Sequence, residues 1–430
     1  MEFLPNLIFA ILLFIGIGFF ARNISKLKRN INLGKDVDTS DQTNIRWKNM
    51  ARIALGQSQM VRRPIAGILH IVVYVGFVII NIEVLEIIID GLFGTHRIFS
   101  GIGSLYGVLI GTFEILAALV FVAVIIFWFR RNVVKIHRFM KSEMKGWPKL
   151  DGNLILYFEI VLMGLFIIMN ATDVEFQSMN SGNIISQFFA PMFEGYNVHL
   201  IERVAWWMHI IGILIFLNYL YYSKHLHILL AFPNTYYGSV KPKGYFNNLE
   251  AVTNEVKLMM DPNIDPFAAT EDDSSAPDKF GASDVQDLNW VQLLNAYTCT
   301  ECGRCTSECP ANQTGKKLSP RKIMMDTRDR LVEVGKNIDS NKGVFVPDGK
   351  ELLGDYITNE ELWACTSCNA CVEACPISID PLSIILEMRR YLVMEQSAAP
   401  MELNTMMSNI ENNGAPWPYN QMDRLNWKND

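Results

Sequence analysis

Long apolar runs occupy the first 232 residues of the chain, and the remainder has the composition of a soluble protein. Five of the runs pass the test of roughly 20 mostly apolar residues that a helix needs to cross a membrane. They lie at Leu4 to Ala21, Ile65 to Ile89, Leu105 to Phe129, Leu154 to Met169 and Val204 to Tyr222. The pattern predicts five membrane-spanning helices, the fourth of them short.

The first apolar run resembles a secretory signal peptide only in its position. Glu2 and no basic residue precede it, and no small-residue cleavage pattern follows where one is expected. We therefore expect this run to be retained as a membrane helix.

Positive charge is unevenly distributed among the loops. Ten Lys or Arg residues lie between Arg22 and Arg63 and seven between Arg130 and Lys149, whereas the two alternate loops carry only Arg97. Loops rich in Lys and Arg stay in the cytoplasm. The sequence thus predicts a multi-pass protein of the inner (cytoplasmic) membrane, with the amino terminus outside and the soluble half inside.

All eight cysteines lie in two copies of one pattern. The first reads C-T-E-C-G-R-C-T-S-E-C-P and the second C-T-S-C-N-A-C-V-E-A-C-P, so both are C-x2-C-x2-C-x3-C-P. This is the spacing of bacterial two-cluster ferredoxins, in which the fourth cysteine of each run ligates the other cluster. The prediction is two [4Fe-4S] clusters, one on Cys299, Cys302, Cys305 and Cys375 and the other on Cys365, Cys368, Cys371 and Cys309.

Two other uses of these cysteines stand beside the clusters. Disulfides and paired zinc ribbons also employ C-x2-C spacing, but zinc leaves four of the cysteines unexplained. Cluster thiolates imply a reducing compartment, which agrees with the cytoplasmic position inferred from the loops.

The chain therefore divides into four parts. Residues 1–232 form an all-α membrane bundle, 233–289 a linker with an acidic core at Asp261 to Asp287, and 290–395 a mostly α-helical ferredoxin-like domain. Within that domain we expect helices over Ile323 to Val334, opened by Ser319-Pro320, and over Pro381 to Met394. Residues 396–430 are expected to be an extended tail that binds a partner.

Histidines suggest a second kind of cofactor. His70 lies near the cytoplasmic end of the second span, and His227 lies just after the fifth. Two neutral imidazoles at one depth are typical axial ligands of a b-type haem. His209 precedes His227 by 18 residues, or about 27 Å of helix, on the same side. The alternative for each histidine is a hydrogen-bonded packing residue.

The membrane half resembles the gamma-subunit family of respiratory nitrate reductase, which includes the membrane subunit of heterodisulfide reductase. The likeness rests on G-I-L-H-I-V-V-Y-V-G-F, on W-W-M-H and on S-K-H-L-H-I-L-L-A-F-P. It implies that His70 and His227 bind the cytoplasmic-side haem. It also implies an outer haem on His209, but the chain carries Ile80 where the family has the second outer ligand.

The soluble half is similar to the small ferredoxin subunit of heterodisulfide reductase, through C-T-E-C-G-R-C, S-P-R-K-I-M and L-W-A-C-T-S-C. The fused order is like that of membrane-bound electron-transferring-flavoprotein:menaquinone oxidoreductases, which usually continue into a domain with C-C-G repeats. This resemblance implies a cytoplasmic partner, either a separate C-C-G-repeat iron-sulfur protein or a flavoprotein.

Acidic residues inside the spans suggest proton chemistry. Glu83 and Glu86 in the second span and Glu114 in the third are costly in lipid, and such residues are functional candidates by default. Quinol oxidation releases two protons with two electrons, so Glu83, Glu114 and His209 are the candidates for a quinone site. Helix-to-helix hydrogen bonding is the alternative role.

The sequence predicts a membrane-bound electron-transfer subunit of a respiratory oxidoreductase, which passes electrons between menaquinone, haem b and two [4Fe-4S] clusters. A membrane-anchored polyferredoxin that serves as an assembly factor or redox sensor is the alternative. No basic patch suggests nucleic acid, and no dinucleotide fingerprint or phosphate loop suggests hydride transfer within the chain. The direction of electron flow depends on potentials that a sequence does not give.

Overall fold

The fold was analysed in a computed structural model, which describes residues 3–179, 181–242, 244–262 and 279–429. In that part of the chain the regular structure is helical, and β pairing is limited to two isolated bridges. The predicted all-α class is confirmed. The predicted acidic linker falls largely on residues 263–278, outside the described residues.

Five helices are long and apolar enough to cross a membrane, as predicted. They are α1 (Leu4–Ile31), α3 (Pro64–Phe93), α4 (Ser104–Asn132), α5 (Trp147–Thr172) and α7 (Val198–Tyr219), which a 3-10 turn prolongs to Tyr222. All five exceed their apolar runs because polar residues at the ends continue the helix. The fourth span, expected to be short, has 26 residues because it begins at Trp147 with Pro148 in its first turn.

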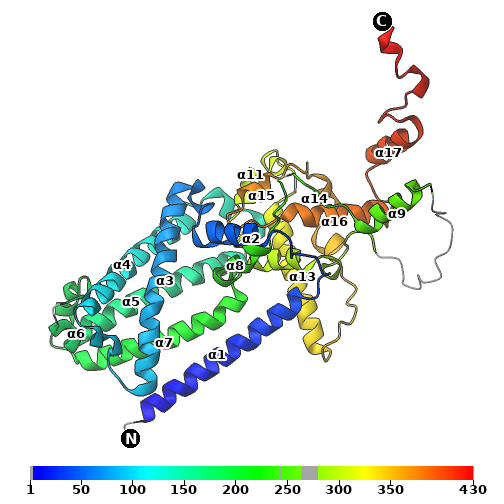
Figure 1. Cartoon of the computed structure of the whole chain (residues 1–430). Coiled ribbons are helices and arrows are strands. Elements are labelled where there is room, and N and C mark those ends of the chain that lie inside the picture. Colours follow the sequence, from blue (N-terminus) through cyan, green and yellow to red (C-terminus); the bar gives the residue numbers. More distant parts are fainter. Residues whose placement is uncertain (1–2, 180, 243, 263–278, 430) are drawn as a thin grey trace.

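The spans form one bundle with a loosely attached member. Helix α5 packs between α4 and α7, and α3 packs on α4. Helix α1 lies along α3 and α7, and most of its apolar residues are exposed, as expected for a helix that faces lipid. Figure 1 shows α1 running from the amino terminus along the bundle to the cysteine-containing half of the chain.

Short helices connect the spans and continue the bundle toward the second half. They are α2 (Thr43–Met50), α6 (Val174–Ser178), α8 (His227–Tyr237) and α9 (Glu250–Met260). Helix α8 packs against α2 and against the first helix of the cysteine-containing domain. It therefore couples the end of the last span to that domain.

The cysteine-containing domain is built around two longer helices, α13 (Pro320–Ser340) and α16 (Pro381–Met394). Ser319 and Asp380 cap them by accepting hydrogen bonds from Lys322 and Ser383 amides, and a proline follows each cap. Around them lie α10 (Trp290–Thr298), α11 (Arg304–Glu308), α12 (Pro310–Gln313), α14 (Asn359–Trp363) and α15 (Ala370–Ala374).

The folded domain begins before Trp290. Val285 is fully buried, and Asp284 forms an ion pair with Arg330 of α13 at 2.7 Å. The end of the expected linker is therefore part of the domain core. At the other end, α17 (Met401–Asn413) has no buried residue and projects away from both halves (Figure 1).

Helix α1 extends past the apolar run and contacts the cysteine-containing domain directly. Lys26 Nζ lies 2.6 Å from Asp339 Oδ2, and Asn30 donates to the Tyr297 hydroxyl at 2.9 Å. A backbone bridge joins Lys35 to the same domain. The two halves are thus joined by the first span as well as by α8.

Candidate functional site

The two cysteine runs converge on two small neighbouring cavities. One is lined by Cys299, Cys302, Cys305 and Cys375, and also by Cys371, which lines both cavities. The other is lined by Cys309, Cys365, Cys368 and Cys371. Each cavity thus gathers the first three cysteines of one run and the last cysteine of the other, which is the grouping expected of a two-cluster ferredoxin.

Matching backbone turns shape the two cysteine loops. Glu301 and Gly303 in the first run have positive φ values of 53° and 69°, and Ser367 and Asn369 in the second have 55° and 58°. These turns curl each loop around its cavity. The Ser367 amide then donates to Cys365 Sγ at 3.4 Å.

The chemistry of the cysteines fits a metal cluster. Burial raises the pKa of Cys299 to about 11 and that of Cys375 to about 12. Such thiols stay protonated at neutral pH unless a metal binds them, because coordination removes the proton. Backbone amides that point at sulfur, such as that of Ile379 at 3.2 Å from Cys375 Sγ, are the hydrogen bonds that tune cluster potentials.

His70 and His227, predicted as a pair, lie close together at the end of the bundle that meets the cysteine-containing domain. Their ring centroids are 6.4 Å apart and the rings are tilted by 37°. Metal–imidazole bonds of about 2 Å, with each ring centre about 1 Å beyond its nitrogen, put two axial imidazole centroids about 6 Å apart. The observed spacing therefore fits two axial ligands of one iron.

Hydrogen bonding around this pair also suits metal ligation. His227 Nδ1 lies 3.0 Å from the Lys224 carbonyl oxygen, so Nδ1 carries the proton and Nε2 has a free lone pair. His70 Nδ1 is buried without a hydrogen-bond partner. Burial lowers the pKa of His227, which keeps the ring neutral as a ligand must be.

His209 lies apart from this pair. It is buried on α7 with its ring 6.2 Å from that of Phe166. Ile80, at the position where the resembling family has a histidine, is buried and apolar. The second span therefore offers no imidazole at that position.

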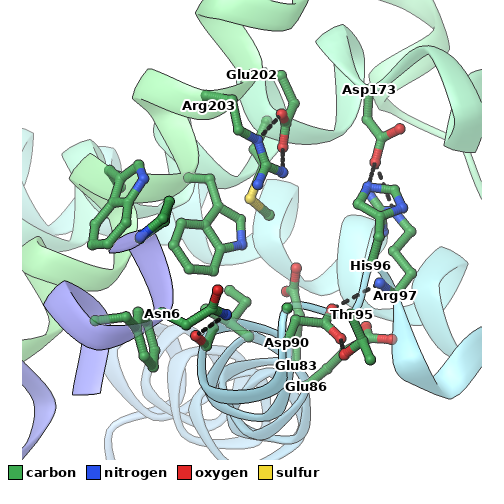
Figure 2. A pocket seen from close by; sticks show the side chains of 18 residues that line it. Asn6, Glu83, Glu86, Asp90, Thr95, His96, Arg97, Asp173, Glu202 and Arg203 are labelled. Atoms are coloured by element: carbon green, nitrogen blue, oxygen red, sulfur yellow. Dashed lines mark hydrogen bonds and ion pairs between the residues drawn. The ribbon is translucent and has the colours of Figure 1, made fainter. Parts of the chain in front are cut away.

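A cavity of about 320 Å³ lies between α1, α3 and α7 at the end of the bundle away from the cysteine-containing domain, here called the outer end. Glu83, Glu86 and Asp90 of α3 face Glu202 and Arg203 of α7 across it (Figure 2). Glu83 is 2% exposed, and its Oε2 has no hydrogen-bond partner. A carboxyl group this deeply buried with a free oxygen is available to a ligand in the cavity.

Aromatic rings form the inner wall of this outer cavity. Phe9 of α1 lies 5.5 Å from Trp206 and 6.1 Å from Trp207, centroid to centroid. Trp206 and Glu202 lie four residues apart on α7, and His209 follows three residues later, so all three share one side of the helix. The cavity thus combines flat apolar surface with an acidic side.

Glu114, also predicted as a proton group, does not line the cavity. Its carboxylate accepts hydrogen bonds from Asn170 Nδ2 at 3.0 Å and from the amides of Ile185 and Ser186 at 2.7 and 3.1 Å. These contacts tie the loop between the fourth and fifth spans to α4. The surroundings of Glu114 match the alternative role, which is structural hydrogen bonding.

Sequence reasoning missed several charged residues that surround the sites. Arg97 links the outer loop to the bundle through Asp173 at 2.7 Å and Asn170 at 2.9 Å. Glu301, between two cysteines, pairs with Lys224 and Arg328. Glu301 and Arg304 both stand within the motif C-T-E-C-G-R-C, but their partners come from parts of the chain that the motif does not place.

Comparisons with known proteins agree with these features. The model of the 4Fe-4S dicluster domain family matches residues 298–379. The chain is 28% identical to a probable iron-sulfur-binding oxidoreductase FadF of Bacillus subtilis, over 89% of this chain and 54% of that protein. It is 25% identical to an EtfAB:quinone oxidoreductase of Syntrophomonas wolfei, over 87% of this chain and 52% of that protein.

Shorter matches cover parts of the chain. A probable membrane-anchored ferredoxin of Chromohalobacter salexigens is 33% identical over 37% of this chain and 25% of that protein. One of the CoB-CoM heterodisulfide reductase polypeptides of Methanosarcina acetivorans is 34% identical over 25% of this chain and 52% of that protein. No solved structure matches.

The chain spans about half the length of the two curated relatives that cover most of it. The resemblance to membrane-bound quinone oxidoreductases of this type and to heterodisulfide reductase subunits, predicted from the motifs, is confirmed. The chain is a membrane-associated iron-sulfur protein, with a five-helix membrane half followed by a 4Fe-4S dicluster domain.

Proposed function

We propose that this chain is the membrane-bound electron-transfer subunit of a respiratory oxidoreductase, and that it connects a quinone in the membrane with a cytoplasmic redox partner. The observation that carries the proposal is the His70–His227 pair, whose ring spacing of 6.4 Å suits one iron. Arg304 of the first cysteine run lies close enough to His70 to act on it electrostatically. The haem and iron-sulfur sites would therefore be neighbours.

The residues would form binding sites for three cofactors, one haem and two clusters. His70 and His227 would hold haem b, and the cysteines would hold two clusters in the groups that line the two cavities. The haem and the two clusters, when bound, carry single electrons. The chain would fix these cofactors in place, and the Lys224 carbonyl orients His227.

The outer cavity is the proposed site for the ring of a quinone such as menaquinone. Phe9, Trp206 and Trp207 offer aromatic surface for the ring, and Glu83 offers a carboxyl oxygen without a partner. A quinone takes up two protons with two electrons, and a quinol releases them. Glu83 would exchange one of these protons with the ring oxygen, and His209 lies on the helix face that leads inward.

The proposed partner is cytoplasmic, a C-C-G-repeat iron-sulfur protein or a flavoprotein. The distribution of Lys and Arg among the loops supports a cytoplasmic position for the cysteine-containing domain, with the outer cavity on the far side of the cytoplasmic membrane. The relative named EtfAB:quinone oxidoreductase supports a flavoprotein and a quinone as the two redox partners.

A pyridine haemochrome assay on the purified full-length protein tests the proposal. We expect about one haem b per chain together with iron for two clusters. Protein that contains clusters but no haem would instead support the second candidate, a membrane-anchored ferredoxin that acts in assembly or redox sensing. The likeness to a probable membrane-anchored ferredoxin favours that second candidate.

The quinone site has a separate test. Glu83→Gln should slow electron exchange between the protein and a menaquinol analogue at least tenfold, because general acid–base groups contribute about 10²–10⁴-fold. Haem and iron content should not change. Glu194→Gln, on the exposed outer loop, is the control. Unaltered exchange in the Glu83→Gln protein would remove Glu83 from the quinone site.

A further inference from the structure

Charged residues are distributed asymmetrically around the two cysteine cavities. The cavity of Cys299, Cys302, Cys305 and Cys375 is lined by the guanidinium-bearing Arg321, which is fully buried. The lining of the other cavity has no charged side chain besides its cysteines. Its remaining members are Leu318, Pro320, Thr366, Asn369, Leu382 and Ile385.

Two further arginines act on the first cavity. Arg304 is 4% exposed and lies close enough to Cys302 and Cys375 to interact electrostatically with their thiolates. Arg138, from the loop between α4 and α5, acts on Cys302 in the same way. Arg321 is neutralised by Glu143, 2.7 Å away.

Among the residues that the structure describes, no carboxylate forms an ion pair with Arg304 or Arg138. Arg304 donates to the carbonyl oxygens of Gln59 and Met60 at 3.0 and 3.2 Å. The Nε of Arg138 is buried without a hydrogen-bond partner. A buried cation without an anion is costly, so a counter-charge is expected nearby. A cluster ligated by four thiolates supplies that negative charge.

The charged residues near the second cavity produce a weaker electrostatic field than those near the first. Arg389 donates to the Leu362 carbonyl at 3.1 Å and lies over the Trp363 ring at 4.9 Å, near Cys365. Asp380, which caps α16, acts on Cys371 with the opposite sign. Glu301 acts on Cys299 of the first cavity with the opposite sign, but it is paired with Lys224 and Arg328. The charges of Arg389 and Asp380 near the second cavity therefore offset one another, whereas those of Arg304 and Arg138 add at the first.

Reduction adds one negative charge to a cluster. Nearby cations stabilise the reduced form and raise its potential, and a buried site screens them little. Solvent also stabilises added charge, and Cys368 of the second group is exposed. Two uncompensated guanidinium groups at the first cavity act more strongly than water at one edge of the second, because fixed charges in a buried site are not screened by that water.

We propose that Arg304 and Arg138 make the cluster in the first cavity more readily reduced than the cluster in the second. Electrons then run from the cytoplasmic partner through the second cluster to the first and on toward the membrane. This rests on the proposed function and adds its direction. The exposed Cys368 marks the second cluster as the entry point. One electron passes at each step, and the partner is the reductant and the quinone the oxidant.

The membrane loops build this field. Arg138 belongs to the loop between α4 and α5, and Arg304 is held by carbonyls of Gln59 and Met60, which precede α3. The membrane half therefore supplies Arg138 itself and the carbonyl oxygens that orient Arg304. Docking of the two halves sets the cluster potentials as well as their positions.

An EPR-monitored redox titration of the full-length protein in detergent tests the proposal. In the wild type, two one-electron cluster components should titrate. Arg304→Gln should lower the reduction potential of the cluster that has the higher potential. At a fixed solution potential its reduced-to-oxidised ratio should fall about tenfold, equivalent to about 59 mV. Arg304→Lys keeps the charge and should restore most of the potential. Arg138→Gln is a second variant with the same expected direction.

Arg389→Gln is the matched control, because its guanidinium faces the other cluster. It should shift the lower component and leave the higher one in place. The proposal is overturned if Arg304→Gln moves the lower component, or if neither Arg304→Gln nor Arg138→Gln moves any. Haem content, measured in the same samples, tests the proposed function separately, because absence of haem does not alter the order of the two cluster potentials.

Discussion

His227 Nδ1 lies 3.0 Å from the carbonyl oxygen of Lys224, whereas Nδ1 of His70 has no hydrogen-bond partner. The two imidazoles of the pair are therefore supported unequally. Lys224 is itself held by Glu301 and by Asp151, 3.6 Å away, so the support of His227 reaches into the cysteine-containing domain. His70 relies on packing within the bundle.

We expect both histidines to be required for haem. His70→Ala and His227→Ala should each remove the low-spin b-type absorption, because each leaves one axial position without its ligand. Visible spectra and haemochrome content of purified protein measure this. His137→Ala, in an exposed turn, should keep the wild-type spectrum. A full haem complement in both alanine variants would exclude the pair as ligands.

The crossed cysteine grouping predicts how single losses behave. Cys375→Ser should eliminate the first cluster and spare the second, because Cys375 lines the cavity of the first run. Cys368→Ser should do the reverse. Iron analysis and EPR of the reduced proteins distinguish the two. If Cys375→Ser and Cys368→Ser lose the same EPR component, each run holds its own cluster.

Arg97 is expected to stabilise the outer end of the bundle. Its guanidinium bonds Asp173 and Asn170 and lies 4.2 Å from the centroid of the Phe176 ring. Arg97→Met should lower stability by about 3–5 kcal/mol, because Asp173 is left buried without its main partner. Thermal unfolding followed by circular dichroism measures the loss. Combining it with Asp173→Asn should cost less than the sum of the single changes.

A pH effect is expected from His96 at the same end. Its hydrogen bond to Asp173, with Nε2 and Oδ2 3.2 Å apart, raises its pKa against the opposing effects of burial and Arg97. A raised pKa in the fold means stabilisation that is complete below the unfolded value of about 6.5 and lost as pH rises through the folded value. His96 is partly exposed, so the effect should be below about 1 kcal/mol.

Melting temperatures between pH 6 and pH 9 check this expectation. The wild type should lose stability relative to His96→Gln as the pH rises. A difference that stays constant over this range would show that His96 does not gain charge from Asp173.

The spans and the cysteine groups were predictable because each depends on a local pattern. A run of apolar residues marks a helix such as α4, and the spacing of Cys299, Cys302 and Cys305 marks a cluster loop. The depth of His70 and His227 suggested a pair, but their separation depends on how α8 turns back after the fifth span. No periodicity along the chain encodes that turn.

The charged surroundings were less predictable. Glu83 and Glu114 look alike in sequence, yet one has a free oxygen in a cavity and the other is fully bonded to a loop. Arg138 was predicted only as one of the loop charges, yet it lies close enough to Cys302 to act on it electrostatically. Long-range contacts decide such roles, and these contacts join residues more than 50 positions apart.

Helix α1 continues for a further ten residues beyond its apolar run and ends against α13, where Arg29 pairs with Asp339 and donates to the Gly335 carbonyl at 3.0 Å. It connects the membrane bundle rigidly to the cysteine-containing domain. A domain held in this way cannot move between an electron donor and an electron acceptor, as a domain on a flexible linker can. The gap that an electron crosses is then set by the fold rather than by diffusion, so turnover should respond to driving force and be insensitive to solvent viscosity.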